Sequence, residues 1–337
     1  MEIPIISESR RYWLVRTNSG RYYSEFFHGK FVGVGWDAVS ADALERDDEA
    51  LREMFVELYP QFKQPMYAVH QMRRFAKDLR PNDVVLIPSE SSAYVTFGRI
   101  ASDVYEVNVS EDDILEGRCP WTKRRRVEWL KTVERLELDP FLYRLLNSHH
   151  PVTQADDYGS YIDRTLHGFF RKGDTYHLVV HVERAGGIPA TVLPSYLSAL
   201  LELVELFNQE TDSSLSTEEI QLKINVQSPG PIELISGGFA LVLIGIVGII
   251  LVGGKVRWTR EALRATFTME SESLLDKLSN FLDAAHRRRQ EDRQYEALAV
   301  KVKELSEKLE ARYPAELGLR STHPNESMGE DDTAQDE

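Results

Sequence analysis

The spacing of hydrophobic residues divides the first half of the chain into short strands and two helices. Runs rich in aromatic and β-branched residues predict strands at 12–17, 31–36, 84–87, 94–100, 104–109 and 126–130. Between them, apolar residues recur at helical spacing over 41–59 and 66–78. These elements predict a small curved sheet or barrel with two helices packed on it.

The second half begins with a strand at 176–182, a helix at 195–208 and a strand at 220–226. Residues 234–254 then form a run without a single charged side chain, and about 20 such residues span a bilayer. A helix that is apolar around its whole circumference lies either in lipid or inside protein. We therefore predict a transmembrane-type helix at 234–254, with burial in a soluble oligomer as the alternative.

The region beyond this run is dense in residues that favour helices and has neither Gly nor Pro from 258 to 312. We predict one long helix at 255–314 and a disordered acidic tail at 315–337. Five apolar residues near its end follow a heptad spacing: Tyr295, Leu298, Val302, Leu305 and Leu309. This short coiled-coil seam predicts self-association. Gly245 and Gly248 in the apolar run would let helices approach closely in a membrane.

Composition and charge narrow the classes of function. The 337 residues carry a net charge of -14, which argues against a protein that coats duplex DNA. Cys119 is the single cysteine, so neither an intramolecular disulfide nor a thiolate metal cage is expected. The first residues lack a basic segment followed by an apolar one, so we expect the N-terminal domain to be cytoplasmic. The expected domains are 1–172 for recognition and 173–233 for a small α+β unit.

Short motifs follow one another in the first half in a recognisable order. They are YWLVRT at 12–17, GVGWD at 33–37, RPNDVVLIPS at 80–89, YVTFGRI at 94–100 and RRVEWL at 125–130. In this order they resemble the PUA-like, EVE-related domain found ahead of Mrr-type restriction nucleases and other bacterial defence effectors. The resemblance covers about residues 10–150. The last motif of that family usually reads His-x-Arg-x-Val-x-Trp, and Lys123 stands here in place of the histidine.

The resemblance implies a barrel whose pocket holds a nucleotide or a modified base. Aromatic rings would stack on the base, which contributes about 1 to 3 kcal/mol per base, and arginines would meet phosphates. The candidate ligand-binding residues are Trp13, Arg16, Trp36, Tyr94, Arg99, Arg125 and Trp129. The alternative for each aromatic residue is a place in the core of a small barrel.

No catalytic site, metal site or cofactor is predicted. Gln221 and Lys223 imitate the end of the Mrr-type metal site, with Asp212 upstream, but Asp212 lacks the Gly-rich hairpin that presents such an acid. His149 and His150 lack the spacing of metal ligands and are expected to be loop residues.

The second half is also similar to a small α+β unit common in bacterial conflict proteins, which agrees with a defence setting. The predicted fold class is α+β: a PUA-like β-barrel with packed helices, a small α+β unit, the apolar helix and the long helix. The predicted function is a non-enzymatic sensor and membrane effector in antiphage defence. A bound nucleotide or modified base would act through a homo-oligomer in the membrane, with defence-system partner proteins possible. The alternatives are a soluble adaptor that recruits a separate nuclease or ATPase, and a degenerate Mrr-like nuclease.

Overall fold

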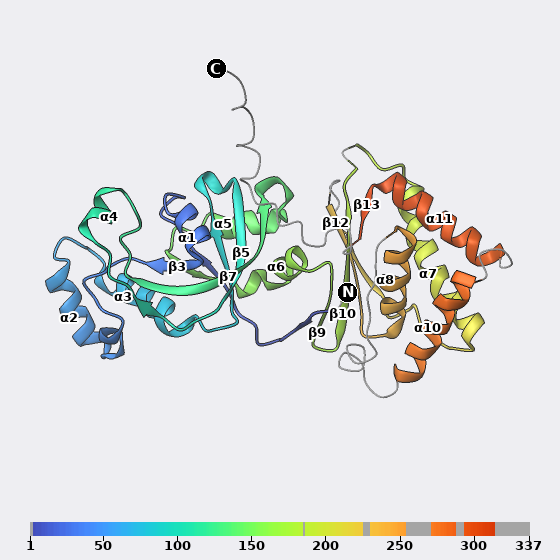
Figure 1. Cartoon of the computed structure of the whole chain (residues 1–337), viewed down its shortest axis with the longest axis horizontal. Helices are drawn as coiled ribbons and strands as arrows, with labels where there is room; N and C mark the ends of the chain where they lie inside the picture. Colours follow the sequence, from blue (N-terminus) through green and yellow to red (C-terminus); the bar gives the residue numbers. More distant parts are fainter. Residues whose placement is uncertain (1–2, 185, 225–229, 254–270, 288–292, 314–337) are drawn as a thin grey trace, which may run out of the picture.

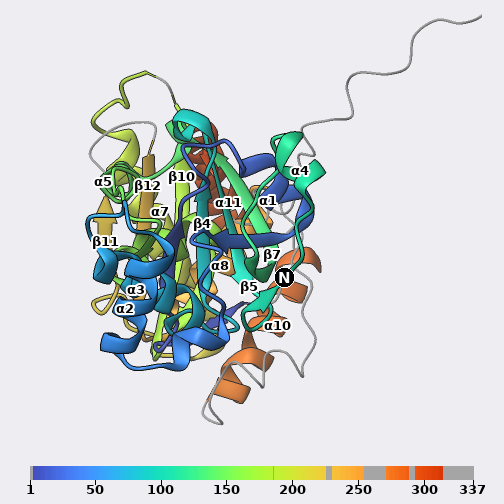
Figure 2. The same ribbon diagram turned by 90° about the vertical axis from the view of Figure 1, so that its left-hand side faces the viewer.

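The computed structural model describes residues 3–184, 186–224, 230–253, 271–287 and 293–313. Within these residues the chain is mixed α/β, with two curled sheets that each carry their own helices (Figure 1). We call them the first unit and the second unit. Figure 2 looks from the α2–α3 end of the molecule, so that the first sheet stands in front of the second unit.

The first sheet has the strand order β3-β7-β5-β4-β2-β8, with β6 paired to β7. Its strands are β2 (Tyr12–Val15), β3 (Phe31–Val34), β4 (Val84–Pro88), β5 (Tyr94–Ile100), β6 (Tyr105–Glu106), β7 (Lys123–Glu134) and β8 (Val152–Gln154). The pair β2/β4 is parallel and the other pairs are antiparallel. All the predicted strands of this half are present. The order ends at β3 and β8, so the described hydrogen bonds do not close the predicted barrel.

Strand β7 gives this sheet its curvature. Its first residues pair with β3, the rest pair with β5, and the register shifts between Phe97 and Gly98 of β5. A Cβ atom on Gly98 would lie 2.5 Å from the ring of Trp129, so this position requires glycine. The bend lets one long strand join both parts of the sheet.

The first unit contains six α-helices: α1 (Tyr23–Gly29), α2 (Asp48–Leu58), α3 (Pro65–Arg73), α4 (Glu111–Leu115), α5 (Pro140–Leu146) and α6 (Gly159–Leu166). Alternate residues of the strands enter two different cores. Trp13 and Val15 of β2 belong to one, and Tyr12 and Leu14 to the other. A third cluster joins α2 to α3 and includes Phe55. The two predicted helices thus agree with α2 and α3.

The second sheet has the order β1-β9-β10-β12-β11. Its strands are β1 (Ile5–Ile6), β9 (Phe169–Lys172), β10 (Thr175–Val182), β11 (Gln221–Ile224) and β12 (Gly230–Ser236), and β13 (Ala311–Arg312) pairs with β10. Strand β1 lies parallel to β9. The predicted recognition domain, 1–172, therefore includes two strands whose hydrogen-bond partners belong to the second sheet.

Four described helices cover one face of the second sheet: α7 (Val192–Thr211), α8 (Phe239–Leu251), α10 (Ser271–Arg287) and α11 (Arg293–Leu309). Figure 1 shows them on the side away from the first unit. Leu178, Leu234 and Ile244 belong to the single large core between sheet and helices. The opposite face of the sheet turns toward α6 of the first unit (Figure 1).

The prediction of a transmembrane-type helix at 234–254 is wrong, and with it that part of the predicted fold class. The apolar run begins in strand β12, and its helix, α8, has 13 residues, or about 20 Å, against a hydrocarbon core of about 30 Å. No helix in the described part of the chain combines the length and the apolarity needed to cross a membrane. Instead, Gly245 and Gly248 admit the rings of Phe169 and Tyr313, which a Cβ atom would approach to 2.8 and 2.7 Å.

Two parts of the predicted long helix at 255–314 are described, as α10 and α11, while 254–270, 288–292 and the predicted tail at 315–337 lie outside the described residues. The heptad seam lies on α11. Leu298, Val302 and Leu309 are buried in the core of the second unit, where α11 packs against α7. The apolar residues of the seam therefore pack against a helix of the same chain. These contacts do not test homo-oligomerisation, which stays a prediction.

Candidate functional site

A cleft of about 790 Å³ opens in the first unit where several strand ends meet. It is bounded by the turn after β2, the turn after β3, the β4–β5 turn, the segment before β7 and the loop between α5 and β8. Its lining residues are Arg16, Asn18, Ser19, Gly35, Trp36, Ser89, Glu90, Ser91, Ser92, Trp121, His149 and Pro151. The lining combines two indoles with hydroxyl, amide, carboxylate and guanidinium groups.

Backbone conformations that L-residues rarely adopt gather at this cleft. Five lining residues other than glycine have a positive φ, namely Asn18, Ser19, Trp36, Ser91 and Ser92, at 52° to 61°. For a residue as bulky as Trp36, at 61°, this is a true outlier. Such strain costs on the order of 1 to 3 kcal/mol per residue and persists where the surrounding structure imposes it, which is typical of ligand sites.

Two of the cleft loops contact each other directly. Gly20 has a φ of 97°, and a Cβ atom there would lie 2.2 Å from the Cα atom of Glu90. Thr17, which is fully buried, donates its hydroxyl to the carbonyl of Pro88 over 2.6 Å. The turn after β2 and the β4–β5 turn therefore hold each other in place and form one wall.

Arg16 lines the cleft and also fixes the neighbouring loop through hydrogen bonds to its backbone. Its Nε donates to the carbonyl of Ser148 over 2.7 Å, and Nη2 donates to the carbonyls of Ser148 and Leu146. These carbonyls belong to the end of α5 and the loop that carries His149. Burial lowers the pKa of Arg16 from its usual range. The guanidinium is therefore largely committed to the backbone.

The two indoles reach the cleft from different elements. Trp36 follows β3 and meets Phe55 and Phe62 in edge-to-face contacts, at centroid distances of 6.5 and 6.0 Å. Trp121 lies against Gly35, where a Cβ atom would be 3.0 Å from its Nε1. Both indoles are partly buried. Each ring is thus supported by protein while it still borders the open volume.

Of the seven candidate ligand-binding residues, Arg16 and Trp36 line the cleft. Trp13 is 1% exposed and donates its Nε1 to Asp83 over 2.9 Å, so it belongs to the core. Arg125 is 2% exposed and is bonded to three main-chain carbonyls. Both of these side chains hold the first unit together.

The other three candidates also lie outside the cleft lining. Tyr94 is an exposed residue at the start of β5. Arg99 is exposed and pairs with Glu128 over 2.5 Å. Trp129 donates its Nε1 to the carbonyl of Phe27 over 2.8 Å and stacks on the Phe27 ring. The structure thus gathers two of the seven candidates at one site.

Trp121 is the principal lining residue that sequence reasoning missed. It lies just before the RRVEWL motif, in a segment with no strand or helix pattern. The hydroxyl groups of Ser89, Ser91 and Ser92 were missed for a similar reason, although Ser89 closes the RPNDVVLIPS motif. His149, expected to be a loop residue, is an exposed loop residue that also lines the cleft. The signal available in the sequence was the polar Ser-rich turn between two apolar strands.

The residues of the third hypothesis, the degenerate nuclease, do not assemble into a metal site among the described residues, where no group of three metal-ligating side chains is found. Asp212 is the left-handed C-terminal cap of α7, and its carbonyl accepts from Lys277. Gln221 and Lys223 lie on β11, which ends the second sheet.

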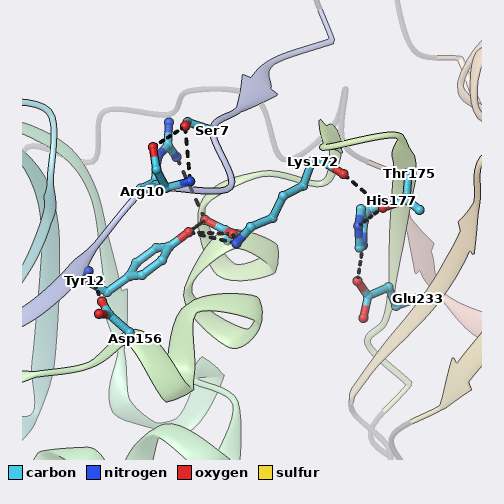
Figure 3. A network of polar contacts seen from close by, with 10 residues as sticks. Ser7, Arg10, Tyr12, Asp156, Lys172, Thr175, His177 and Glu233 are labelled. Carbon is cyan, nitrogen blue, oxygen red and sulfur yellow. Dashed lines mark hydrogen bonds and ion pairs between the residues drawn. The ribbon is translucent and has the colours of Figure 1, made fainter.

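A second polar cluster joins the two units (Figure 3). The buried carboxylate of Asp163 accepts from the Tyr12 hydroxyl over 2.6 Å and from Lys172 Nζ over 2.7 Å, with Arg10 at 3.9 Å. Tyr12 belongs to the first sheet and Lys172 to the second. Burial, and then the charge of Asp163, raise the pKa of Tyr12. The cluster therefore anchors β2 to β9.

Nearby, Arg164 of α6 reaches across the same junction. It contacts Asp139 at the start of α5, and its Nη1 lies 3.5 Å from Glu233 of β12. Glu233 in turn accepts from Nδ1 of the His177 imidazole over 2.8 Å (Figure 3). Two further imidazoles, both partly buried, carry no charge here, because burial lowers the pKa of His167 and of His181 to about 4. The junction is polar, and its cations are matched by buried carboxylates.

Comparison with known proteins finds a similarity in the part of the chain that carries most of the cleft. No curated protein and no solved structure matches the chain. Residues 11–148 match the family model described as "Domain of unknown function (DUF8426)". The matched range runs from β2 to just past α5 and includes every lining residue except His149 and Pro151.

Proposed function

We propose that the first unit is a recognition module that binds a planar heteroaromatic group, of the kind found in nucleobases, in the cleft beside Trp36 and Trp121. The observation that carries this proposal is the presence of two supported indoles at one open, strained and otherwise polar cleft. Nucleobases are bound by stacking on such rings and by hydrogen bonds to their edges. Asn18 and the serine hydroxyls supply both donors and acceptors for those edges.

The charge of the lining favours the base over its phosphates. Arg16 is the one guanidinium in the lining and is already bonded to two carbonyls, while Glu90 adds a carboxylate. A polyphosphate needs several uncommitted cationic donors. We therefore propose that the cleft recognises the base of a modified or unmodified nucleoside and that phosphate groups add little to the affinity.

For the whole chain we propose an adaptor that couples this recognition to a separate nuclease or ATPase. Of the whole-chain roles considered from the sequence, the membrane role required the run at 234–254 to span lipid, whereas α8 is a core helix of the second unit. The polar junction between the two units connects the recognition cleft of the first unit to the second unit. The defence setting rests on the motif resemblance.

Titration calorimetry tests the recognition proposal. The full chain would be titrated with adenosine, cytidine, N6-methyladenosine and 5-methylcytidine, and with the 5′-monophosphate of each. We expect at least one nucleoside to bind, with its monophosphate within about threefold in affinity. Trp121→Ala should weaken that binding about tenfold or more, because it removes one stacking face.

Tyr94→Ala is the matched control, since this aromatic side chain is exposed and lies outside the cleft. It should leave nucleoside affinity unchanged. Binding that requires the phosphate, or equal losses in Trp121→Ala and Tyr94→Ala, would contradict the proposed site. A folded wild-type chain that binds none of the eight compounds would contradict the ligand class.

A further inference from the structure

Lys123, the first residue of β7, has an ammonium group with no exposed surface. It donates to the carbonyl of Trp36 over 3.0 Å and to the carbonyl of Val39 over 2.9 Å, and it lies 3.8 Å from Asp37 Oδ1. Burying a charged group is costly unless it is hydrogen-bonded. All three of these contacts are made to one turn, the turn that carries Trp36.

Trp36 is a residue that needs such support. Its φ of 61° is rarely adopted by a residue with a large side chain, and a relaxed backbone would rotate the indole away from its present direction. Its carbonyl accepts both from Lys123 Nζ and from the amide of Val39. Asp37 is fixed in turn, because Oδ1 accepts from the amide and the hydroxyl of Thr122. Besides the amide of Val39, the donors to this turn therefore come from Lys123 and its chain neighbour Thr122.

We propose that Lys123 is a positioning residue for ligand recognition, which holds Trp36 in the left-handed conformation that presents its indole to the cleft. This inference rests on the proposed function for its ligand, but the geometry that it asserts can be measured without one. Lys123 itself does not line the cleft. Its effect on binding would therefore pass entirely through the orientation of Trp36.

Fluorine NMR of the full chain labelled with 5-fluorotryptophan measures that orientation. The five tryptophans give separate resonances, which single Trp→Phe changes assign. In Lys123→Met, which keeps the length but removes the donors, the Trp36 resonance should shift or split while that of Trp13 stays. Lys131→Met is the matched control, because Lys131 is on the same strand but donates to Thr165, away from the cleft.

The four nucleosides are then titrated into the same variants. Lys123→Met should weaken the binding found for the wild type about tenfold or more at an equal folded fraction, and Lys131→Met should not. An unchanged Trp36 resonance in Lys123→Met overturns the positioning role, whether or not a nucleoside binds. A wild-type chain that binds no nucleoside while Trp36 still shifts refutes the ligand class and supports the positioning role.

An alkaline titration of the labelled wild type covers the case in which Lys123→Met fails to fold. Burial lowers the pKa of Lys123, and this effect is opposed by the nearby charges of Asp37 and Glu106. The hydroxyl of Tyr59 accepts from the amide of Ala38, and burial raises the pKa of Tyr59. The Trp36 resonance should move with a midpoint below that of an ordinary lysine. A Trp36 resonance that does not move before the protein unfolds overturns the proposal.

Discussion

Lys123 and Arg125 occupy alternate positions on strand β7 and are both buried cations that hydrogen-bond main-chain carbonyls. Arg125 donates to Phe75, Ala76 and Ser102, over 2.7 to 2.9 Å, and so ties the end of the α3 region to the sheet. Sequence reasoning assigned Arg125 to the ligand. Its surroundings show that it satisfies backbone groups that would otherwise be buried without partners.

Arg125→Ala should therefore destabilise the protein by about 3 kcal/mol or more, since each buried carbonyl left unpaired costs about 1 to 3 kcal/mol. Urea unfolding followed by circular dichroism measures the change. Arg99→Ala is the control, because Arg99 is 45% exposed and its ion pair with Glu128 is worth under about 1 kcal/mol. Equal stability of Arg125→Ala and the wild type would reopen a ligand role for Arg125.

At the scale of single elements, helix α8 is the central helix of the second unit's hydrophobic core. Its residues are buried on nearly every side, and two glycines in it accommodate aromatic rings from β9 and from the segment after β13. Ile246 is 3% exposed and belongs to the large core. A polar face is absent from this helix because sheet, α7 and α11 surround it.

Ile246→Lys should lower the free energy of unfolding by at least about 3 kcal/mol, because it removes buried packing and places a charge in the core. Thermal unfolding, with near-ultraviolet circular dichroism as a probe of packing, measures the loss. Val300→Lys on α11 is the control, at a position that is 49% exposed, and should have little effect. A variant Ile246→Lys as stable as the wild type would show that α8 is not part of the core.

At the scale of the molecule, the two units meet through a polar junction that contains two partly buried, neutral histidines. Arg10, Lys131 and Asp163 face His167, and the cations that face His181 are Lys131, Arg164 and Arg312. The Nε2 atom of His167 has no hydrogen-bond partner among the described residues. Protonation of either ring would add a positive charge where cations already lie close.

The junction predicts a loss of stability in mild acid. Both histidines have a pKa of about 4 in the folded chain against about 6.5 when unfolded, so the unfolded chain binds more protons between these values. Stability should be full above about pH 6.5 and fall as pH decreases toward 4. Urea midpoints from pH 7 to 5 measure the slope, which the double variant His167→Gln, His181→Gln should reduce. Equal slopes in the two proteins would contradict this origin.

The sequence by itself determined most of the local structure. Strand patterns at 31–36 and 94–100 and the helix pattern at 195–208 correspond to β3, β5 and α7, because alternation and helical spacing are properties of a short segment. Motif resemblance placed seven candidate residues at one site, and the structure brings two of them, Arg16 and Trp36, to one cleft. Trp121 was not predicted as a site residue, because it lies in an irregular segment whose position depends on packing against Gly35 and Tyr22.

Tertiary structure alone decided what surrounds each apolar surface. The run at 234–254 has the same composition whether lipid or protein covers it, and only the contacts of α8 distinguish the two. The heptad seam of α11 likewise specifies a partner helix without specifying whether α7 or a second chain provides it. Strands β1 and β9 pair although more than 160 residues of sequence separate them, and Lys123 donates to the carbonyl of Trp36, which lies 87 residues earlier in the chain. Such long-range pairings depend on the packing of the whole chain, which local patterns do not encode.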